Sequence, residues 1–91
     1  MPGNVLTYSI KYVDTAAAIF ATPVLLGKIV WSAPTTTNHV LLISDADGVV
    51  LFTAKAAAAN DYFEFDFNGA PHSLTVTTID SGVLLIYPYL P

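Results

Sequence analysis

The dominant pattern along the chain is an alternation of apolar and polar residues with a period of two, which predicts half-buried β-strands. Residues 5–13 (VLTYSIKYV) predict a first strand whose apolar face carries Leu6, Tyr8, Ile10 and Tyr12. The same alternation in residues 62–67 (YFEFDF) predicts three inward phenylalanines, at positions 63, 65 and 67, and places Tyr62, Glu64 and Asp66 on the outward face.

Further strands are predicted on either side of two short reversals. HVLLIS and GVVLFTA flank the aspartates of residues 45–48 (DADG), and SLTVTTI and VLLIYPYL surround residues 80–82 (DSG). Gly supplies the positive φ that such tight turns require. Both reversals are therefore interpreted as turns between strands.

The other segments are less regular. Residues 27–33 (GKIVWSA) predict a strand with Ile29 and Trp31 on one face. The stretch DTAAAIFATPVLLGKIVW, which begins at residue 14, is less regular, because Pro23 and Gly27 interrupt the alternation, and its alanines are compatible with a loop or one helical turn. Residues 33–38 (APTTTN) predict a polar loop and residues 55–61 (KAAAAND) a turn or short helical link, while Pro88 and Pro91 favour an edge strand or a tail.

Seven or eight short strands at intervals of 8–12 residues, without helical periodicity, are typical of a small antiparallel β-sandwich or barrel. We expect one all-β domain over residues 1–91, with extended tails at residues 1–4 and 88–91.

Charge is scarce: 11% of the residues are charged and 54% are hydrophobic, against about 25% charged residues in ordinary soluble domains. This predicts that part of the surface is buried in an assembly. The net charge of −4, the absence of arginine and the scattered positions of Lys11, Lys28 and Lys55 argue against a nucleic-acid partner. The apolar stretches are much shorter than the ~20 residues of a membrane-spanning helix, so no membrane partner is expected.

The aspartates of residues 45–48 resemble part of a calcium loop. An EF-hand loop needs glycine at its sixth position and glutamate at its twelfth. Counted from Asp45, Gly48 is fourth and Ala56 is twelfth, so the pattern fails and a chain reversal is favoured. A calcium site of another kind, formed by Asp45, Asp47 and Asp61, stays open, but no metal is expected.

Other candidate groups favour ordinary structural roles. His39 and His72 have Ser73 and Asp80 as formal partners, but no serine lies in a recognisable nucleophile elbow. Glu64 and Asp66 share a strand face, as paired glycosidase carboxylates do, yet a solvated face is the simpler interpretation. A sugar-stacking platform is conceivable, but core or interface anchors are favoured for its aromatic residues, Trp31, Tyr62, Tyr87 and Tyr89. We therefore expect neither an enzyme nor a cofactor.

Three segments together are similar to a family of proteins: GKIVWSAPTT, LLISDADGVVLFTAKAA and SLTVTTIDSGVLLIYPYL. They resemble small β-rich virion proteins of tailed bacteriophages. In that group a G-x-I-x-W strand precedes a D-x-x-G-x-x-L/I-F hairpin, and L-x-V-x-x-I-D-S-G-x-L-x-I-Y closes the pattern. The resemblance covers residues 27 to 88, about two thirds of the chain.

This resemblance implies a capsid decoration (cement) protein on the outer surface of the virion. The implied partners are the major capsid protein and other virion subunits, and a homo-oligomer, either a dimer or a trimer, is expected. The interface residues expected from this reading are Trp31, Tyr87, Tyr89 and Leu90, with the terminal segments adding strands to a neighbour. The alternatives are a tail, fibre or head–tail connector component, and a small glycan-binding sandwich.

Overall fold

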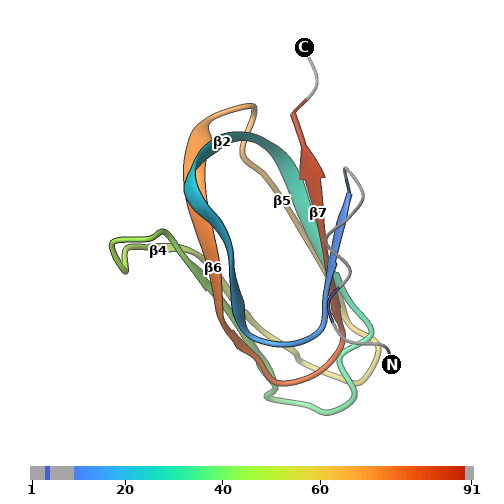
Figure 1. Cartoon of the computed structure of the whole chain (residues 1–91). Coiled ribbons are helices and arrows are strands. Elements are labelled where there is room, and N and C mark those ends of the chain that lie inside the picture. Colours follow the sequence, from blue (N-terminus) through green and yellow to red (C-terminus); the bar gives the residue numbers. More distant parts are fainter. Residues whose placement is uncertain (1–3, 5–9, 90–91) are drawn as a thin grey trace.

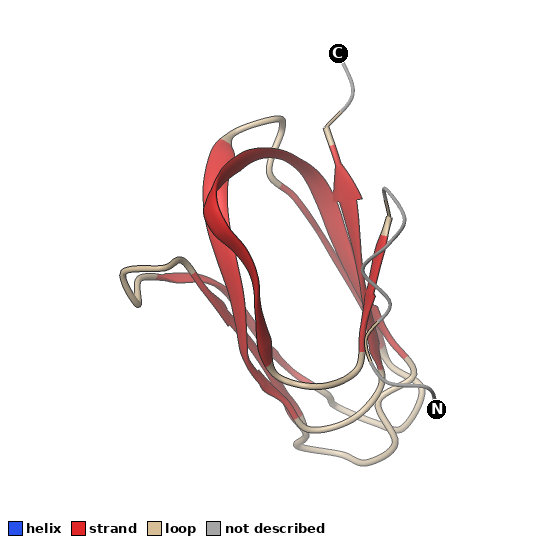
Figure 2. Cartoon of the chain, viewed as in Figure 1, coloured by secondary structure: helices blue, strands red, loops and turns tan. Residues whose placement is uncertain are grey.

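The computed structural model describes Asn4 and residues 10–89, and within them the chain forms strands and no helix (Figure 2). This confirms the predicted all-β class. The part of the chain that is described therefore contains no helix able to cross a membrane. The strands are β1 (Lys11–Val13), β2 (Ala17–Ser32), β3 (Val40–Ser44), β4 (Val50–Lys55), β5 (Tyr62–Asp66), β6 (Pro71–Ile79) and β7 (Val83–Pro88).

All strand pairs are antiparallel, and they form one open sheet in the order β1-β7-β2-β6-β3-β4, with β5 also paired to β2. The strand β2 belongs to two layers. Its first part, to Leu25, pairs with β6, and its second part, from Leu26, pairs with β7 and β5. We call β1, β7, β5 and the second part of β2 layer A, and the first part of β2 with β6, β3 and β4 layer B. Figure 1 shows β2 curving from one layer to the other, so the sheet is folded into a sandwich.

The loop or helical turn expected at the alanines is wrong, because a strand begins at Ala17. Pro23 and Gly27, which interrupt the alternation, lie where β2 bends from layer B to layer A. Register shifts lie between Phe20 and Val24 and between Leu26 and Lys28, and Pro23 falls in the first of these, where it is paired with no residue of β6. At Gly27 a Cβ atom would lie 3.0 Å from the carbonyl oxygens of Tyr87 and Pro88. The residue without a side chain thus stands where β2 and β7 approach most closely.

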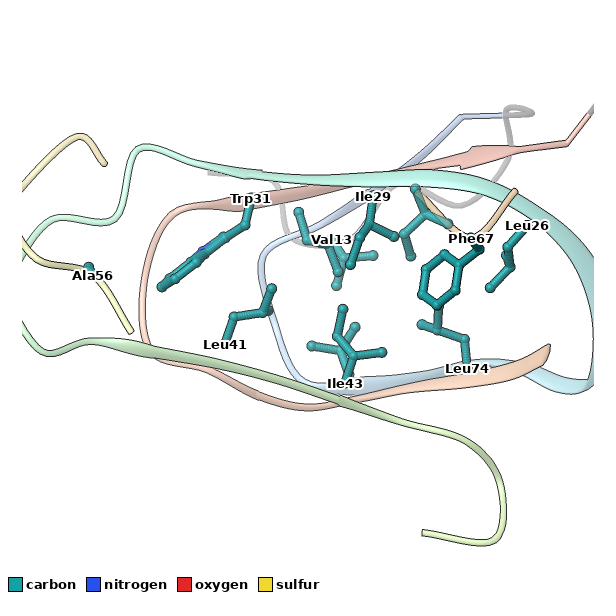
Figure 3. Packing of buried hydrophobic residues seen from close by; sticks show 12 residues of the cluster. Val13, Leu26, Ile29, Trp31, Leu41, Ile43, Ala56, Phe67 and Leu74 are labelled. Atoms are coloured by element: carbon teal, nitrogen blue, oxygen red, sulfur yellow. The ribbon is translucent and has the colours of Figure 1, made fainter. Parts of the chain in front are cut away.

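The hydrophobic core lies between the layers (Figure 3). Layer A contributes Ile29 and Trp31 from β2, as the alternation predicted, and layer B contributes Leu41 and Ile43 from β3. Burial of such branched and aromatic side chains supplies the main favourable term in folding. The full set of core residues is Val13, Leu26, Ile29, Trp31, Leu41, Ile43, Ala56, Phe67, Leu74, Val76, Leu84 and Ile86.

The inward face expected for the first strand is wrong where it is described. Ile10 is 44% exposed, whereas Val13 is fully buried and pairs with Leu84. The strand β1 is short and lies against β7 alone, so it is the pairing with β7, and not the apolar pattern, that decides which residues face the core. Residues 5–9 lie outside the described part.

The C-terminal strand is also placed differently from the expectation of an edge or tail. It lies between β1 and β2, and Pro88 is its last residue, paired with Leu26. The Tyr89 N–H donates to the carbonyl oxygen of Leu25 at 3.1 Å. The expected tail over 88–91 is thus paired with β2 as far as Tyr89, and residues 90–91 lie outside the described residues. Of the expected N-terminal tail only Asn4 is described, and its Oδ1 accepts hydrogen bonds from the Asp14 and Thr15 N–H groups.

The alternation in residues 62–67 is confirmed in direction. Phe63 is opposite Trp31, and Phe65 is opposite the core residue Ile29. Phe67, which follows the strand, is 7% exposed, but Phe65 is 37% exposed, because β5 is an edge strand. The Phe65 ring lies 5.1 Å from the Phe52 ring of β4 and 5.0 Å from that of Phe67, so aromatic contacts partly close this open side of the sandwich.

Candidate interaction surfaces

Trp31, the first of the predicted interface residues, is a core residue. It is 1% exposed, and its ring stacks on Phe63 with centroids 5.4 Å apart. Its Nε1–H donates to the carbonyl oxygen of Ser81 at 3.0 Å. The indole has therefore used both its face and its donor inside this fold, and the prediction that it contacts a partner is corrected.

One end of the sandwich is formed, within the described part of the chain, by three segments that contain no charged residue. There the bend of β2 meets the turn between β5 and β6 and the end of β7 (Figure 1). We call residues 21–27, 68–71 and 88–89 the uncharged end, since they include no Asp, Glu, Lys, Arg or His. Leu25 is 48% exposed and Tyr89 is 41% exposed. Lys28, Asp66 and His72 flank these segments, and large apolar side chains that face solvent are typical of a protein-binding surface.

Tyr89, a predicted interface residue, is held in place at this end. A Cβ atom at Gly69 would lie 2.9 Å from the Tyr89 ring, and Gly69 has φ of +81°. Only glycine combines this backbone conformation with a ring packed directly upon it. The tyrosine thus has a fixed, partly exposed position. Leu90, the last predicted interface residue, lies outside the described residues.

The opposite end of the sandwich is rich in carboxylates. Its loops carry Asp14, Asp61 and Asp80. The carboxylate of Asp80 accepts a hydrogen bond from the Val40 N–H at 2.8 Å, and that of Asp61 accepts one from the Ala57 N–H at 2.9 Å. The two ends therefore differ in chemistry: one is apolar and uncharged, and the other is acidic with carboxylates bound to loop backbone.

Tyr87, the remaining predicted interface residue, belongs to a polar cluster on the outer face of layer A. Lys28 of β2 forms an ion pair with Glu64 of β5 at 3.3 Å, and its Nζ lies 5.3 Å from the centre of the Tyr87 ring. The Tyr62 hydroxyl donates to the other Glu64 oxygen at 2.8 Å. This cluster ties β5 and β7 to β2 from outside.

The cluster shifts the pKa of each of three members. Hydrogen bonds from Tyr62 and Lys28, together with the lysine charge, lower the pKa of Glu64. Its hydrogen bond to Glu64 raises the pKa of Lys28, and the same kind of bond raises the pKa of Tyr62. The carboxylate's contribution to stability is present above its unfolded pKa and is lost as the pH falls through the lower folded pKa. The contributions of Lys28 and Tyr62 to stability are present below their unfolded pKa values. They are lost as the pH rises through their raised folded-state pKa values.

These shifts lead to a titration experiment. In Tyr62→Phe and in Lys28→Met the pKa of Glu64 is expected to rise toward its ordinary value, since each variant removes a donor to the ionised carboxylate. Carboxyl ¹³C chemical shifts measured against pH check this. Lys55→Met, which removes an exposed lysine of layer B, is the matched control and should leave Glu64 unchanged. Equal Glu64 titrations in all four proteins would contradict the cluster.

The aromatic residues named for a sugar-stacking platform are not on one surface. Tyr62 and Tyr87 lie on the outer face of layer A, around Lys28. Trp31 faces the core on the inner side, and Tyr89 packs on Gly69 at the uncharged end. A stacking platform needs its rings side by side on one accessible face, which this arrangement does not provide.

The aspartates of residues 45–48 form the tip of the β3–β4 hairpin, as predicted. The Asp45 carboxylate accepts hydrogen bonds from the Asp47 and Val49 N–H groups, both at 2.9 Å, and Gly48 has φ of +85°. Asp61 follows the loop at the other end of β4, so the calcium ligand set Asp45, Asp47 and Asp61 is not brought together. Among the described residues, no group of three or more potential ligands lies close enough to hold a metal ion.

One serine–histidine pair is present that the sequence did not single out. The His39 Nδ1 lies 2.7 Å from the Ser81 Oγ, which also accepts a hydrogen bond from the Thr35 N–H at 2.8 Å. Because the hydroxyl accepts from Thr35, its own proton is free to point at Nδ1. The pair joins the 33–39 loop to the 80–82 turn. The two residues are 42 positions apart, so no local motif could have revealed it.

The other polar candidates also bind the backbone or neighbouring rings. The Ser73 Oγ accepts a hydrogen bond from the Ala46 N–H at 2.8 Å, which fixes the base of the hairpin tip. His72 lies against Phe67, with ring centroids 5.3 Å apart. Asp66 accepts a hydrogen bond from the Asn68 N–H at 2.7 Å, while Glu64 is paired with Lys28. These contacts account for each group by local structure.

Comparison of the chain with models of protein families, with curated proteins and with solved structures found no match to any of them.

Proposed function

We propose that this chain is a non-enzymatic structural protein of a tailed-phage virion, a decoration protein that binds the outer surface of the assembled capsid and stabilises it. The observation that carries the proposal is the uncharged end, with Leu25 and Tyr89 exposed on it. The resemblance of residues 27–88 to small phage virion proteins is the reason for assigning the chain to a phage virion.

The chemistry of the uncharged end suits a permanent contact with a large protein surface. Apolar and backbone contacts persist in salt, whereas contacts between exposed charges are screened within about 10 Å at 0.1 M salt. The acidic end, with Asp14, Asp61 and Asp80, would then face solvent and keep the coated particle soluble. The difference between the two ends thus orients the domain on the shell.

The polar side chains that resemble catalytic groups support a structural role. Ser81, Ser73 and Asp80 each accept a hydrogen bond from a backbone N–H of this chain. Such bonds hold loops and turns in one conformation. A rigid domain loses less conformational freedom on binding, which favours affinity for a fixed surface.

Stabilisation of the particle would follow from mass action. A protein that binds the assembled shell and not the free subunits lowers the free energy of the assembled state. Many copies on one shell multiply this effect, and a decoration protein that is itself oligomeric gains further through effective concentration.

The test is co-sedimentation with assembled shells and with free major capsid protein of the phage that encodes the chain, followed by heating of bare and coated shells. We expect binding to assembled shells only, and a higher melting temperature for coated shells. Equal melting of bare and coated shells would refute the proposal. Recovery of only about a dozen copies per particle would indicate a connector or tail component.

The contact surface is tested by adding one charge at either end. Leu25→Asp introduces a carboxylate on the uncharged end and is expected to weaken shell binding by at least about tenfold, because the charge must be desolvated in the contact. Ala58→Asp, in the exposed segment 57–60 at the acidic end, is the matched control and should bind as the wild type does. Unchanged binding by Leu25→Asp, measured in the same sedimentation assay, would remove the uncharged end as the contact.

A further inference from the structure

Among the described residues, the strand β4 has one unpaired edge. It is the last strand of layer B, and its pairing there is with β3. The hairpin that it forms with β3 projects away from the body of the sandwich, as Figure 1 shows for the segment labelled β4. An unpaired row of backbone N–H and C=O groups on a projecting hairpin is a template for another strand.

The other edges of the sheet carry short length, charges or proline, which hinder pairing, whereas β4 carries one register shift, at Leu51. The strand β1 has three residues. The strand β5 carries Glu64 and Asp66, and the first part of β2 contains Pro23 and two register shifts. Short length, charges, proline and bulges are the devices that protect sheet edges. In contrast, residues 48–54 (GVVLFTA) contain neither a charge nor a proline.

The side chains of this edge are apolar and accessible. Val49 is 58% exposed and Val50 is 53% exposed, and both follow the turn at Gly48. Next to them, Leu51 and Phe52 are half-buried. A run of β-branched and aromatic residues with this exposure loses contact with water when a second strand covers it.

Two opposite charges lie at the two ends of this run. Asp47 stands at the hairpin tip and Lys55 ends β4. Neither forms an ion pair with a described residue. A second copy of β4 placed antiparallel, about a two-fold axis at Leu51, brings the hairpin tip with Asp47 of each copy to the Lys55 end of the other. A parallel copy would instead place like charges together.

We propose that the chain associates with a second copy of itself through the β4 edges. The two β4 strands run antiparallel about a two-fold axis, and the two B layers join into one sheet. Two ion pairs between Asp47 and Lys55 set the register, and the valines between them supply the apolar contact. Such an isologous contact is closed, so it gives a dimer and not a filament.

Charge exchange tests this arrangement by sedimentation equilibrium of the purified protein across a concentration series. We expect a dimer for the wild type. Asp47→Lys and Lys55→Asp each replace two attractive contacts by two repulsive ones and should weaken the dimer by at least about tenfold. The double variant restores both pairs with reversed signs and should associate as the wild type does.

A mixture of the two single variants gives the sharpest result. Asp47→Lys carries two lysines on its edge, and Lys55→Asp carries two aspartates. A heterodimer of the two variants therefore has two attractive contacts. We expect dimers in the mixture at concentrations where each variant alone is monomeric. Ala16→Lys, an exposed residue before β2, is the control for an added lysine and should leave the dimer unchanged. Circular dichroism checks that each variant is folded.

Three outcomes would overturn the proposal: a wild type that stays monomeric at its highest soluble concentration, a dimer that both single variants leave intact, or a mixture that stays monomeric. The measurement needs no shells. A failed β4 dimer therefore leaves shell binding by the uncharged end untouched, and failed shell binding leaves the dimer untouched.

Discussion

Replacing Trp31 with alanine is expected to lower the free energy of unfolding by about 4 kcal/mol, the cost of removing a large buried aromatic side chain. The residue is 1% exposed, stacks on Phe63 and binds the Ser81 carbonyl oxygen. Its removal leaves a cavity between the layers and an unpaired carbonyl at the 80–82 turn. Urea denaturation followed by circular dichroism measures the loss.

Trp31→Phe separates the two contributions. It keeps an aromatic ring beside Phe63 but loses the Nε1–H donor and part of the volume, so we expect a loss of about 1.5 kcal/mol. A stable, folded Trp31→Ala protein with less than about 1 kcal/mol lost would contradict a core role for this residue. It would also restore the original view of Trp31 as a contact for a partner.

Replacing Gly82 with alanine is expected to cost about 3 kcal/mol. Gly82 has φ of +80°, which costs a residue with a side chain about 1 kcal/mol. In addition, its Cβ atom would lie 2.5 Å from the Ser32 carbonyl oxygen and 2.9 Å from the Pro34 nitrogen. These are backbone atoms of the last residue of β2 and of the loop that follows it, so they move only if this part of the backbone moves, which costs about 2 kcal/mol more.

Gly48→Ala is the matched control for this prediction. Gly48 has φ of +85°, yet no atom of the residues that the structure describes lies within 4 Å of the position of its Cβ. Alanine there carries the conformational cost alone, so we expect a loss of about 1 kcal/mol. Thermal and urea unfolding of the two variants isolate the close approach of the 80–82 turn to β2. Equal losses would show that this approach has no energetic consequence.

The sequence predicted most of the layer B strands and the turns between them. Alternation and the Asp-Gly and Ser-Gly reversals are local signals, and they placed the β3–β4 hairpin and the β6–β7 turn correctly. The long strand β2 escaped prediction, because the proline and glycine of a bent strand resemble those of a loop. The inward face of β1 was not predicted either, since the pairing with β7 decides which of its residues face the core.

The surfaces were harder to predict than the strands. Trp31 is of a residue type common to cores and interfaces, and its burial depends on Phe63, which only the β2–β5 pairing brings near. The uncharged end combines three separate segments, so it exists only after β2 has bent between the layers. A local signal was nevertheless present, because residues 19–27 contain no charge.

The position of β7 constrains when the sandwich can form during synthesis. Within the described residues the strand β1 pairs with β7, and β7 separates it from β2. Layer A therefore stays incomplete until residues 83–88 have emerged from the ribosome, although β1 and β2 emerge first. The β3–β4 hairpin can close earlier, because its partners are neighbours in sequence. During translation the nascent chain thus holds a finished hairpin beside an unfinished core.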